Sequence, residues 1–254
     1  MQFRTILRPQ KSDVDIDYHH PILTIGSCFA ENIGQRLAAV RFSTLCNPWG
    51  ILYNPISIAK SVNLIVTDYS FTEDDIFEHG GLWHSWQHHG RFSHPDKKVI
   101  LRGVNESLFK AQNFIKKANR LIITLGSAYV YVLKDTGETV ANCHKVPASF
   151  FEKKRLSVEE IVDDFSNTIN LLKGQSADLQ ILMTVSPVRY IRDGIVENQK
   201  SKAILLLAVE ALCEKFNNVH YFPAYELVMD DLRDYRFYEE DMVHPNKQIG
   251  RAHV

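Results

Sequence analysis

The sequence predicts an α/β fold: a three-layer α/β/α sandwich around a central parallel sheet of about five strands, of the flavodoxin-like type. Short apolar runs alternate along the chain with longer segments of helical period, which is typical of a parallel sheet wrapped by helices. With 254 residues and no linker or internal repeat, the sequence fits one domain spanning 1–254. The hydrophobic fraction of 45% is that of an ordinary globular protein.

The first half of the chain supplies strands and helices in alternation. The apolar run Pro21–Gly26 predicts a buried strand, and Ala30–Val40 follows it with apolar residues at helical spacing. A second strand is expected at Phe42–Cys46 and a helix at Ile56–Val66. This order gives the first strand–helix–strand–helix units of a parallel sheet.

The second half continues the alternation. Arg120–Gly126 is the clearest central strand. The turn residues Asp135–Gly137 separate two short runs, Tyr129–Leu133 and Glu138–Asn142, which predicts a hairpin. The remaining expected elements are a charged, solvated helix entry at Glu152–Arg155, a helix at Val158–Leu172, a strand at Leu179–Val185, a helix at Ser201–Phe216 and a last strand at Val219–Phe222.

Charge and cysteine content limit the function classes. The formal net charge of -1 disfavours a nucleic-acid partner. The longest apolar stretch, Ala203–Cys213, is interrupted by Glu210 and is far shorter than the ~20 residues that span a bilayer, so no membrane partner is expected. Residues 1–9 lack the apolar core of a secretory signal. The four cysteines form no C-x-x-C pair, which favours free thiols in the reducing cytoplasm.

Small polar residues follow each major strand, where the ligand crevice of an open parallel sheet lies. The first cluster, Gly26–Ala30, places Ser27 and Cys28 between the end of a strand and the start of a helix. The unpaired N–H groups and dipole of a helix favour negative charge there, which promotes a thiolate and offers donors to an oxyanion. A nucleophile and a helix start chosen only for tight packing are both consistent with this pattern.

A carboxylate and an imidazole, Asp241 and His244, follow the last predicted strand. In an Asp-x-x-His pair the carboxylate can hold the tautomer of the ring and stabilise its cation while the ring takes a proton from a nucleophile. The spacing also occurs by chance in surface loops. Its interest lies in the topology, which puts the pair opposite the Gly26–Ala30 cluster.

The segment Gly26-Ser27-Cys28-Phe29-Ala30 resembles the namesake motif of the GSCFA family, which belongs to the SGNH/GDSL hydrolase superfamily. The resemblance runs from about residue 20 to 247 and uses several independent motifs. These further motifs are Asn47–Pro55, Thr124–Ala128, Ala141–Lys145, Thr184–Arg189, Glu197–Ala203 and Asp241–Pro245.

The resemblance implies a Cys/Ser–His–Asp triad. Aligned on the glycines, it places Cys28 where the superfamily has its nucleophilic serine and Ser27 where the superfamily has aspartate. Cys28 is therefore the favoured nucleophile and Ser27 the alternative. The same resemblance makes His244 the base and then the acid, oriented by Asp241.

The oxyanion donors transfer less directly from the family pattern. Gly50 is the implied backbone N–H donor. No asparagine follows Gly126, so the side-chain donor would be Ser127 or Asn142. The resemblance also implies a further helix after the last motif, whereas the sequence ends at Val254.

A segment rich in histidine and tryptophan, His79–His94, has two interpretations. As metal ligands, His84 and His88 would share one face of a helix, but the glycines argue against a helix and no acidic or Cys ligand completes the set. The family resemblance instead implies that His88 and His89 lie in a loop lining the pocket. Asn54, in the second motif, is a further candidate for substrate binding.

Four other side chains have a functional and a structural interpretation each. Trp83 and Trp86 would either stack on a sugar ring or pack the loop against the core, and packing is the commoner role of such side chains. Arg189 would bind an anionic substrate group or form a structural ion pair. His144 would be a second pocket histidine or a polar residue that closes the hairpin.

These observations predict acyl-ester chemistry: hydrolysis of an ester, or transfer of an acyl group, such as acetyl, to a carbohydrate or similar alcohol. The expected partner is a small-molecule or saccharide ester, and no cofactor or metal is expected. The alternative is a saccharide- or ligand-binding module on the same scaffold without catalysis, supported by the missing asparagine. A metal-assisted hydrolase is the third reading.

Overall fold

The computed structural model describes residues 6–7, 12, 14–175 and 178–246. Most of the segment 1–9 that was compared with a secretory signal, and the segment 247–254 after the last motif, lie outside the described residues. Its centre is a parallel five-stranded sheet in the order β2-β1-β5-β9-β10. The predicted α/β class and flavodoxin-like strand order are therefore confirmed. The strands are β1 (Ile22–Gly26), β2 (Thr44–Cys46), β5 (Arg120–Leu125), β9 (Gln180–Val185) and β10 (Val219–Tyr221).

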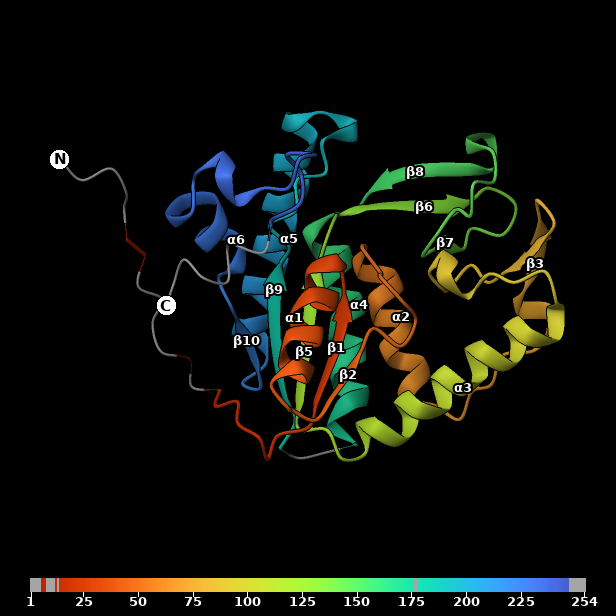
Figure 1. Cartoon of the computed structure of the whole chain (residues 1–254), viewed down its shortest axis with the longest axis horizontal. Coiled ribbons are helices and arrows are strands. Elements are labelled where there is room, and N and C mark those ends of the chain that lie inside the picture. The colour runs from red at the N-terminus through yellow and green to blue at the C-terminus, as the bar shows by residue number, and fades with distance from the viewer. Residues whose placement is uncertain (1–5, 8–11, 13, 176–177, 247–254) are drawn as a thin grey trace.

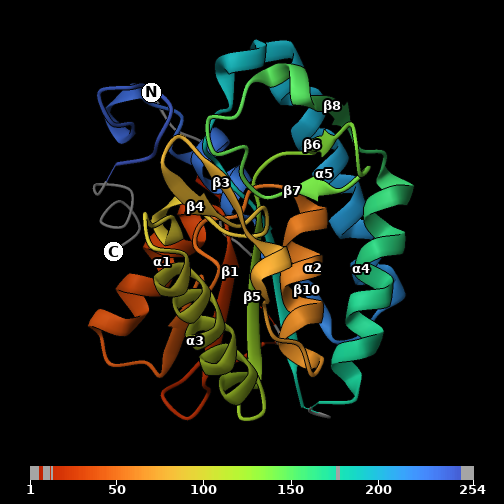
Figure 2. The same cartoon turned by 90° about the vertical axis from the view of Figure 1, so that its right-hand side faces the viewer.

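Helices cover both faces of this sheet. Figure 2 shows α1 (Cys28–Ala39) on one side of the strands and α2 (Pro55–Val66) and α4 (Val158–Lys173) on the other. Helix α5 (Ile195–Lys215) packs against α4, and α3 (Lys97–Ile115) packs against α2. Strand β1 is buried along its whole length, as expected for a parallel strand covered by helices on both faces.

The helices begin where the sequence supplies capping groups. The Asn54 side chain accepts the N–H of Ser57 at 2.8 Å, and Pro55 occupies the first helical turn of α2. Ser157 and Glu160 form a capping box at the start of α4. These caps satisfy N–H groups that have no partner inside the helix.

A small antiparallel sheet lies beyond the carboxyl end of the main sheet (Figure 1). Strand β6 (Tyr129–Leu133) pairs with β7 (Thr139–Val140), which confirms the predicted hairpin. It also pairs with β8 (Phe151–Arg155). The expectation of a helix entry at Glu152–Arg155 is therefore wrong: the four residues are exposed as expected, but they form an edge strand, and α4 begins only at Val158.

Other parts of the structure add to the expected elements or change their bounds. Helix α3 and the hairpin of β3 (Phe77–His79) and β4 (Leu82–His84) precede β5. Helix α5 begins at Ile195 rather than at Ser201. After β10 the chain forms one short turn of helix, α6 (Ala224–Glu226), which continues as a π-helical turn at Leu227–Asp231.

None of the helices in the described part of the chain is both long and apolar enough to cross a membrane. The four cysteines, Cys28, Cys46, Cys143 and Cys213, are free.

Candidate active site

The turn between β1 and α1 holds the first candidate residues in a fixed geometry. Gly26 has φ +140°, and a Cβ built there would lie 2.2 Å from the backbone oxygen of Thr124. Ser27 follows as the N-cap of α1, with an extended backbone and a side-chain oxygen that accepts the N–H of Phe29 at 3.3 Å. Its side chain is buried, and the residue is 1% exposed. Ser27 therefore serves as a helix cap whose hydroxyl is withdrawn from solvent.

A polar network from three segments braces this turn. The Asn47 side chain accepts the N–H of Gly26 at 2.9 Å and donates to Glu31 at 2.9 Å. Arg91 pairs with Glu31 at 3.1 Å and donates to the Asn47 carbonyl at 2.6 Å. A fully satisfied network of this kind rigidifies the backbone that it contacts. It fixes the direction in which Cys28, the next residue but one after Gly26, leaves the strand.

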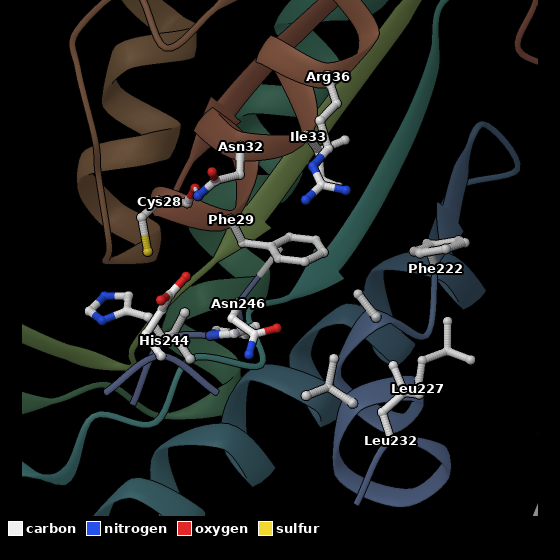
Figure 3. Close-up of a pocket in the computed structure, with 15 residues that line it drawn as sticks. Cys28, Phe29, Asn32, Ile33, Arg36, Phe222, Leu227, Leu232, His244 and Asn246 are labelled. Carbon is white, nitrogen blue, oxygen red and sulfur yellow. Dashed lines mark hydrogen bonds between the residues drawn. The ribbon is translucent and has the colours of Figure 1, made fainter. Parts of the chain in front are cut away.

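Cys28 is the first residue of α1 and lines a pocket, with its thiol pointing toward the loop that carries His244 (Figure 3). Burial raises the pKa of the Cys28 thiol. The N–H groups of Cys28 and Phe29 act against this effect, as does the charge of Lys202, while Asp241 adds to it. The thiol is thus in a poorly hydrated position with two backbone donors beside it.

Asp241 and His244 form a tight pair in the loop after α6. The Oδ2 atom of Asp241 lies 2.6 Å from Nδ1 of His244, and Oδ1 accepts the N–H groups of Val243 and His244 at 2.8 and 2.9 Å. Hydrogen bonds from His244 and Val243 hold the pKa of Asp241 down, to about 2. With the carboxylate accepting from Nδ1–H, the lone pair of the imidazole lies on Nε2.

The pocket brings the thiol and the imidazole to one site, although no hydrogen bond joins Cys28 to His244, both of which are described residues. The pocket has a volume of about 400 Å³. Its walls between α1 and the segment that follows β10 are largely apolar (Figure 3). They include Phe29, Ile33, Phe222, Leu227 and Leu232.

Lys202 of α5, which was not among the candidates from the sequence, is buried and interacts electrostatically with Cys28. It is 1% exposed, and its Nζ donates to the carbonyls of Gly126 and Ser186, both at 2.7 Å. Burial lowers the pKa of Lys202 to about 7, against the influence of Cys28. The sequence carried a signal for it, because position 202 shares the buried face of α5 with Leu205 and Val209.

The predicted oxyanion donors do not line the pocket of Cys28 and His244, and the backbone donor among them is already hydrogen-bonded. The N–H of Gly50 donates to the Asn47 carbonyl at 2.8 Å, so it is not free for an oxyanion. The Ser127 hydroxyl lies 3.4 Å from the hydroxyl of Ser201 and accepts the N–H of Tyr129 at 3.1 Å. The side-chain oxygen of Asn142 accepts the N–H of His144 at 2.8 Å. The N–H groups of Cys28 and Phe29 are the donors nearest the thiol.

Asn54 likewise has a structural role, since it caps α2 and its amide donates to the carbonyl of Val140 at 3.4 Å. It thereby ties the start of α2 to the small sheet. None of Gly50, Asn54, Ser127 and Asn142 is among the residues that line the pocket of Cys28 and His244.

The predicted pocket histidines form part of an aromatic core rather than the pocket of Cys28. His88 is fully buried, and its Nδ1 lies 2.9 Å from the Ser85 hydroxyl. Nε2 of His144 lies 2.9 Å from the Ser85 carbonyl. Burial lowers the pKa of His88 to about 3 and that of His144 to about 4. His89 caps a short 3₁₀ turn and packs its Cβ against Gly50.

The two tryptophans are covered by neighbouring side chains, in agreement with the packing interpretation. Trp86 stacks on Phe77 with ring centroids 3.6 Å apart. The ammonium of Lys97 lies over the ring of Trp83 at 4.7 Å.

Arg189 lies beside the His244 loop, but outside the pocket of Cys28. Its N–H donates to the carbonyl of Val243 at 3.3 Å, and its guanidinium stacks over Tyr238 at 4.1 Å. The second pocket that it lines also includes Tyr235. Within the residues that the structure describes, no three His, Cys, Asp or Glu side chains are grouped so that they could hold a metal ion.

Among solved structures, an acetyl xylan esterase (Est2A) from the rumen bacterium Butyrivibrio proteoclasticus is similar, with 12% sequence identity and a TM-score of 0.35. The alignment covers 84% of this chain, which spans only 57% of the length of that esterase. No curated protein matches the chain. The model of the GSCFA family matches residues 21–253, from the first strand past the Asp241–His244 pair, and the chain therefore belongs to the GSCFA family.

Proposed function

We propose that the chain is an SGNH-type acyl-ester hydrolase or O-acyltransferase in which Cys28 is the nucleophile, His244 the base and Asp241 the residue that orients it. One observation carries the proposal: a thiol at a helix N-terminus shares a pocket with an imidazole whose Nδ1 is held by a carboxylate. Ser27 is set aside as the nucleophile because its buried hydroxyl caps α1.

The reaction divides into two steps. His244 takes the thiol proton on Nε2 while the sulfur of Cys28 forms a bond to the carbonyl carbon. The oxyanion that develops accepts a hydrogen bond from the N–H of Cys28 at the start of α1. The alkoxide then leaves with the proton from His244. In the second step His244 activates water or an alcohol, which attacks the thioester and frees Cys28.

Two features support this assignment. The Ser27 cap and the hydrogen bond from Gly26 to Asn47 hold Cys28 rigidly. The loop that carries His244 is exposed, and 47% of the His244 side chain is accessible to solvent. Closure of this loop on a bound ester would bring Nε2 to the thiol, since catalytic hydrogen bonds often tighten only in the substrate complex. The apolar walls formed by Phe29 and Phe222 suit an uncharged acyl group such as acetyl. The alcohol portion, which we propose to be a carbohydrate, would lie toward solvent.

Turnover of p-nitrophenyl acetate tests the proposal. We expect His244→Ala to lower kcat/KM by at least about 10³-fold, because the thiol loses its proton acceptor. The exposed His19 provides a matched control, and His19→Ala should retain the activity of the unmodified protein. Undiminished turnover in His244→Ala would exclude the mechanism.

A second candidate function is a saccharide-binding module without catalysis. The engagement of the Gly50 N–H favours it, since the expected backbone donor to an oxyanion is not offered to substrate. An electrophilic acyl probe discriminates between the two functions. A covalent adduct at Cys28 supports the enzyme, whereas saccharide binding by calorimetry without any adduct supports the module.

A further inference from the structure

Lys202 is a buried cation that forms no ion pair with a carboxylate in the described part of the chain. Its Nζ donates to two backbone carbonyls, those of Gly126 and Ser186, each at 2.7 Å. An ammonium offers three donors, and these two bonds use two of them. Keeping a charged lysine 1% exposed with two carbonyls as its hydrogen-bond partners is costly, because removing a charge from water carries a large desolvation penalty that an opposite charge nearby helps to offset.

The sheet topology places this ammonium at the edge from which Cys28 projects. Gly126 follows β5 and Ser186 follows β9, and these two strands pair in parallel up to Leu125 and Val185. Strand β1 lies on the other side of β5, and its last residue, Gly26, pairs with Thr124. Parallel strands meet at the same edge with their carboxyl ends, so the anchors of Lys202 and the thiol of Cys28 belong to one cluster.

The charges of the two groups act on each other. The positive charge of Lys202 lowers the pKa of Cys28, and negative charge on Cys28 raises the pKa of Lys202. Burial acts on both in the opposite sense. Each group is therefore more easily ionised when the other is ionised, as in a coupled pair.

We propose that Lys202 is a positioning residue for Cys28: its ammonium, anchored by the carbonyls of Gly126 and Ser186, supplies the positive charge that stabilises the Cys28 thiolate. This proposal rests on the proposed function only because it takes Cys28 as the nucleophile. Lys202 transfers no proton, since the thiol proton goes to His244 and the lysine acts through its charge alone.

The other ionisable groups around the thiol do not supply this charge. Asp241, in the loop after α6, acts on the thiol in the opposite direction. Tyr53, in the segment before α2, is a phenol whose pKa burial raises to about 12, so it is neutral. Arg36 of α1 also lines the pocket, but Lys202 is the cation whose charge acts on the Cys28 thiol.

The test is the pH dependence of Cys28 alkylation by iodoacetamide, followed by peptide mass spectrometry so that the other three cysteines are counted separately. At about pH 6–7 we expect Lys202→Met to slow alkylation of Cys28 about tenfold and to shift its profile to higher pH, because a nearby opposite charge changes a pKa by about one unit or more. The control is Lys200→Met on the same helix, where the lysine pairs with Glu197 at the surface. This variant should match the unmodified protein.

A folded Lys202→Met protein with an unchanged profile would overturn the proposal and leave Lys202 a purely structural tie. If that variant does not fold, the reciprocal measurement decides. In Cys28→Ala, the pKa of Lys202 from NMR titration of its Cε resonance should fall, and an unchanged value would contradict the coupling. Neither measurement needs a substrate. Failure of ester turnover and failure of the Lys202 assignment can therefore be told apart.

Discussion

At the scale of single residues, two neighbours with similar chemistry have different environments. Ser27 and Cys28 were both candidates for the nucleophile, and the resemblance to the family favoured Cys28. The fold buries the hydroxyl of Ser27 against the N–H of Phe29 and turns the thiol of Cys28 into the pocket. At this strand–helix junction, two consecutive side chains point in different directions. The sequence alone does not show which of the two faces the pocket.

This difference predicts separable effects of two substitutions. Ser27→Ala removes a helix cap, so we expect a loss of about 1 kcal/mol in the free energy of unfolding, with the adduct of an acyl probe still formed at Cys28. Cys28→Ala should abolish the adduct and leave stability nearly unchanged. Urea unfolding and mass spectrometry measure the two properties. An adduct that disappears in Ser27→Ala but persists in Cys28→Ala would assign the nucleophile to Ser27 instead.

At the scale of elements, the β1–α1 turn depends on one glycine. Gly26 combines φ +140° with a close approach to the Thr124 oxygen, so an added Cβ is unfavourable both for the backbone and for packing. We expect Gly26→Ala to lower the free energy of unfolding by about 2–4 kcal/mol. Gly103, inside α3, is the matched control because a Cβ there meets nothing within 4 Å. Gly103→Ala should stabilise the protein by about 0.5–1 kcal/mol.

Chemical denaturation of both variants checks this pair. If Gly26→Ala is as stable as the unmodified protein, the turn tolerates a side chain at this position. The inference that this turn holds Cys28 rigidly would then be wrong.

The elements that sequence reasoning found and those it missed differ in how much of their signal is local. Strands β1, β5 and β9 are apolar runs that need no context. Helix α3 carries its own signal, an Asp96 cap and buried residues from Ile100 to Ile115 at helical spacing, and the sequence analysis did not use it. Strand β8 has no such signal, because Phe151 is its one buried residue and pairing with β6 decides its conformation.

At the scale of the whole molecule, buried histidines make stability depend on pH. The native pKa values of His88 and His144, about 3 and about 4, lie below the ordinary value of 6.5. Below about pH 6.5 these two histidines bind protons in the unfolded chain but stay neutral in the native state. The free energy of unfolding therefore falls as the pH falls toward 4. The slope is at most about 2.7 kcal/mol per pH unit.

Asp164 partly opposes this trend. Burial raises its native pKa to about 6, so between pH 6 and its ordinary value the native state holds a proton that the unfolded chain lacks. Solvent access reduces the size of this contribution. We expect urea unfolding between about pH 7 and 4.5 to show stability decreasing with acid, more steeply in Asp164→Asn than in the unmodified protein. Stability that stays constant over this range would contradict the assignment of neutral, buried histidines.

By itself the sequence determined the fold class, the strand order and the two motifs that supply Cys28 and the Asp241–His244 pair. It could do so because buried strands, helix periods and short motifs are local patterns. Only the tertiary structure decided that Cys28 rather than Ser27 faces the pocket and that the N–H of Gly50 is bonded to Asn47. It also decided that Lys202 is buried on the carbonyls of Gly126 and Ser186. Hydrogen-bond partners and burial depend on segments that are far apart in the sequence. The order of the residues alone does not give the distances between those segments in the folded protein.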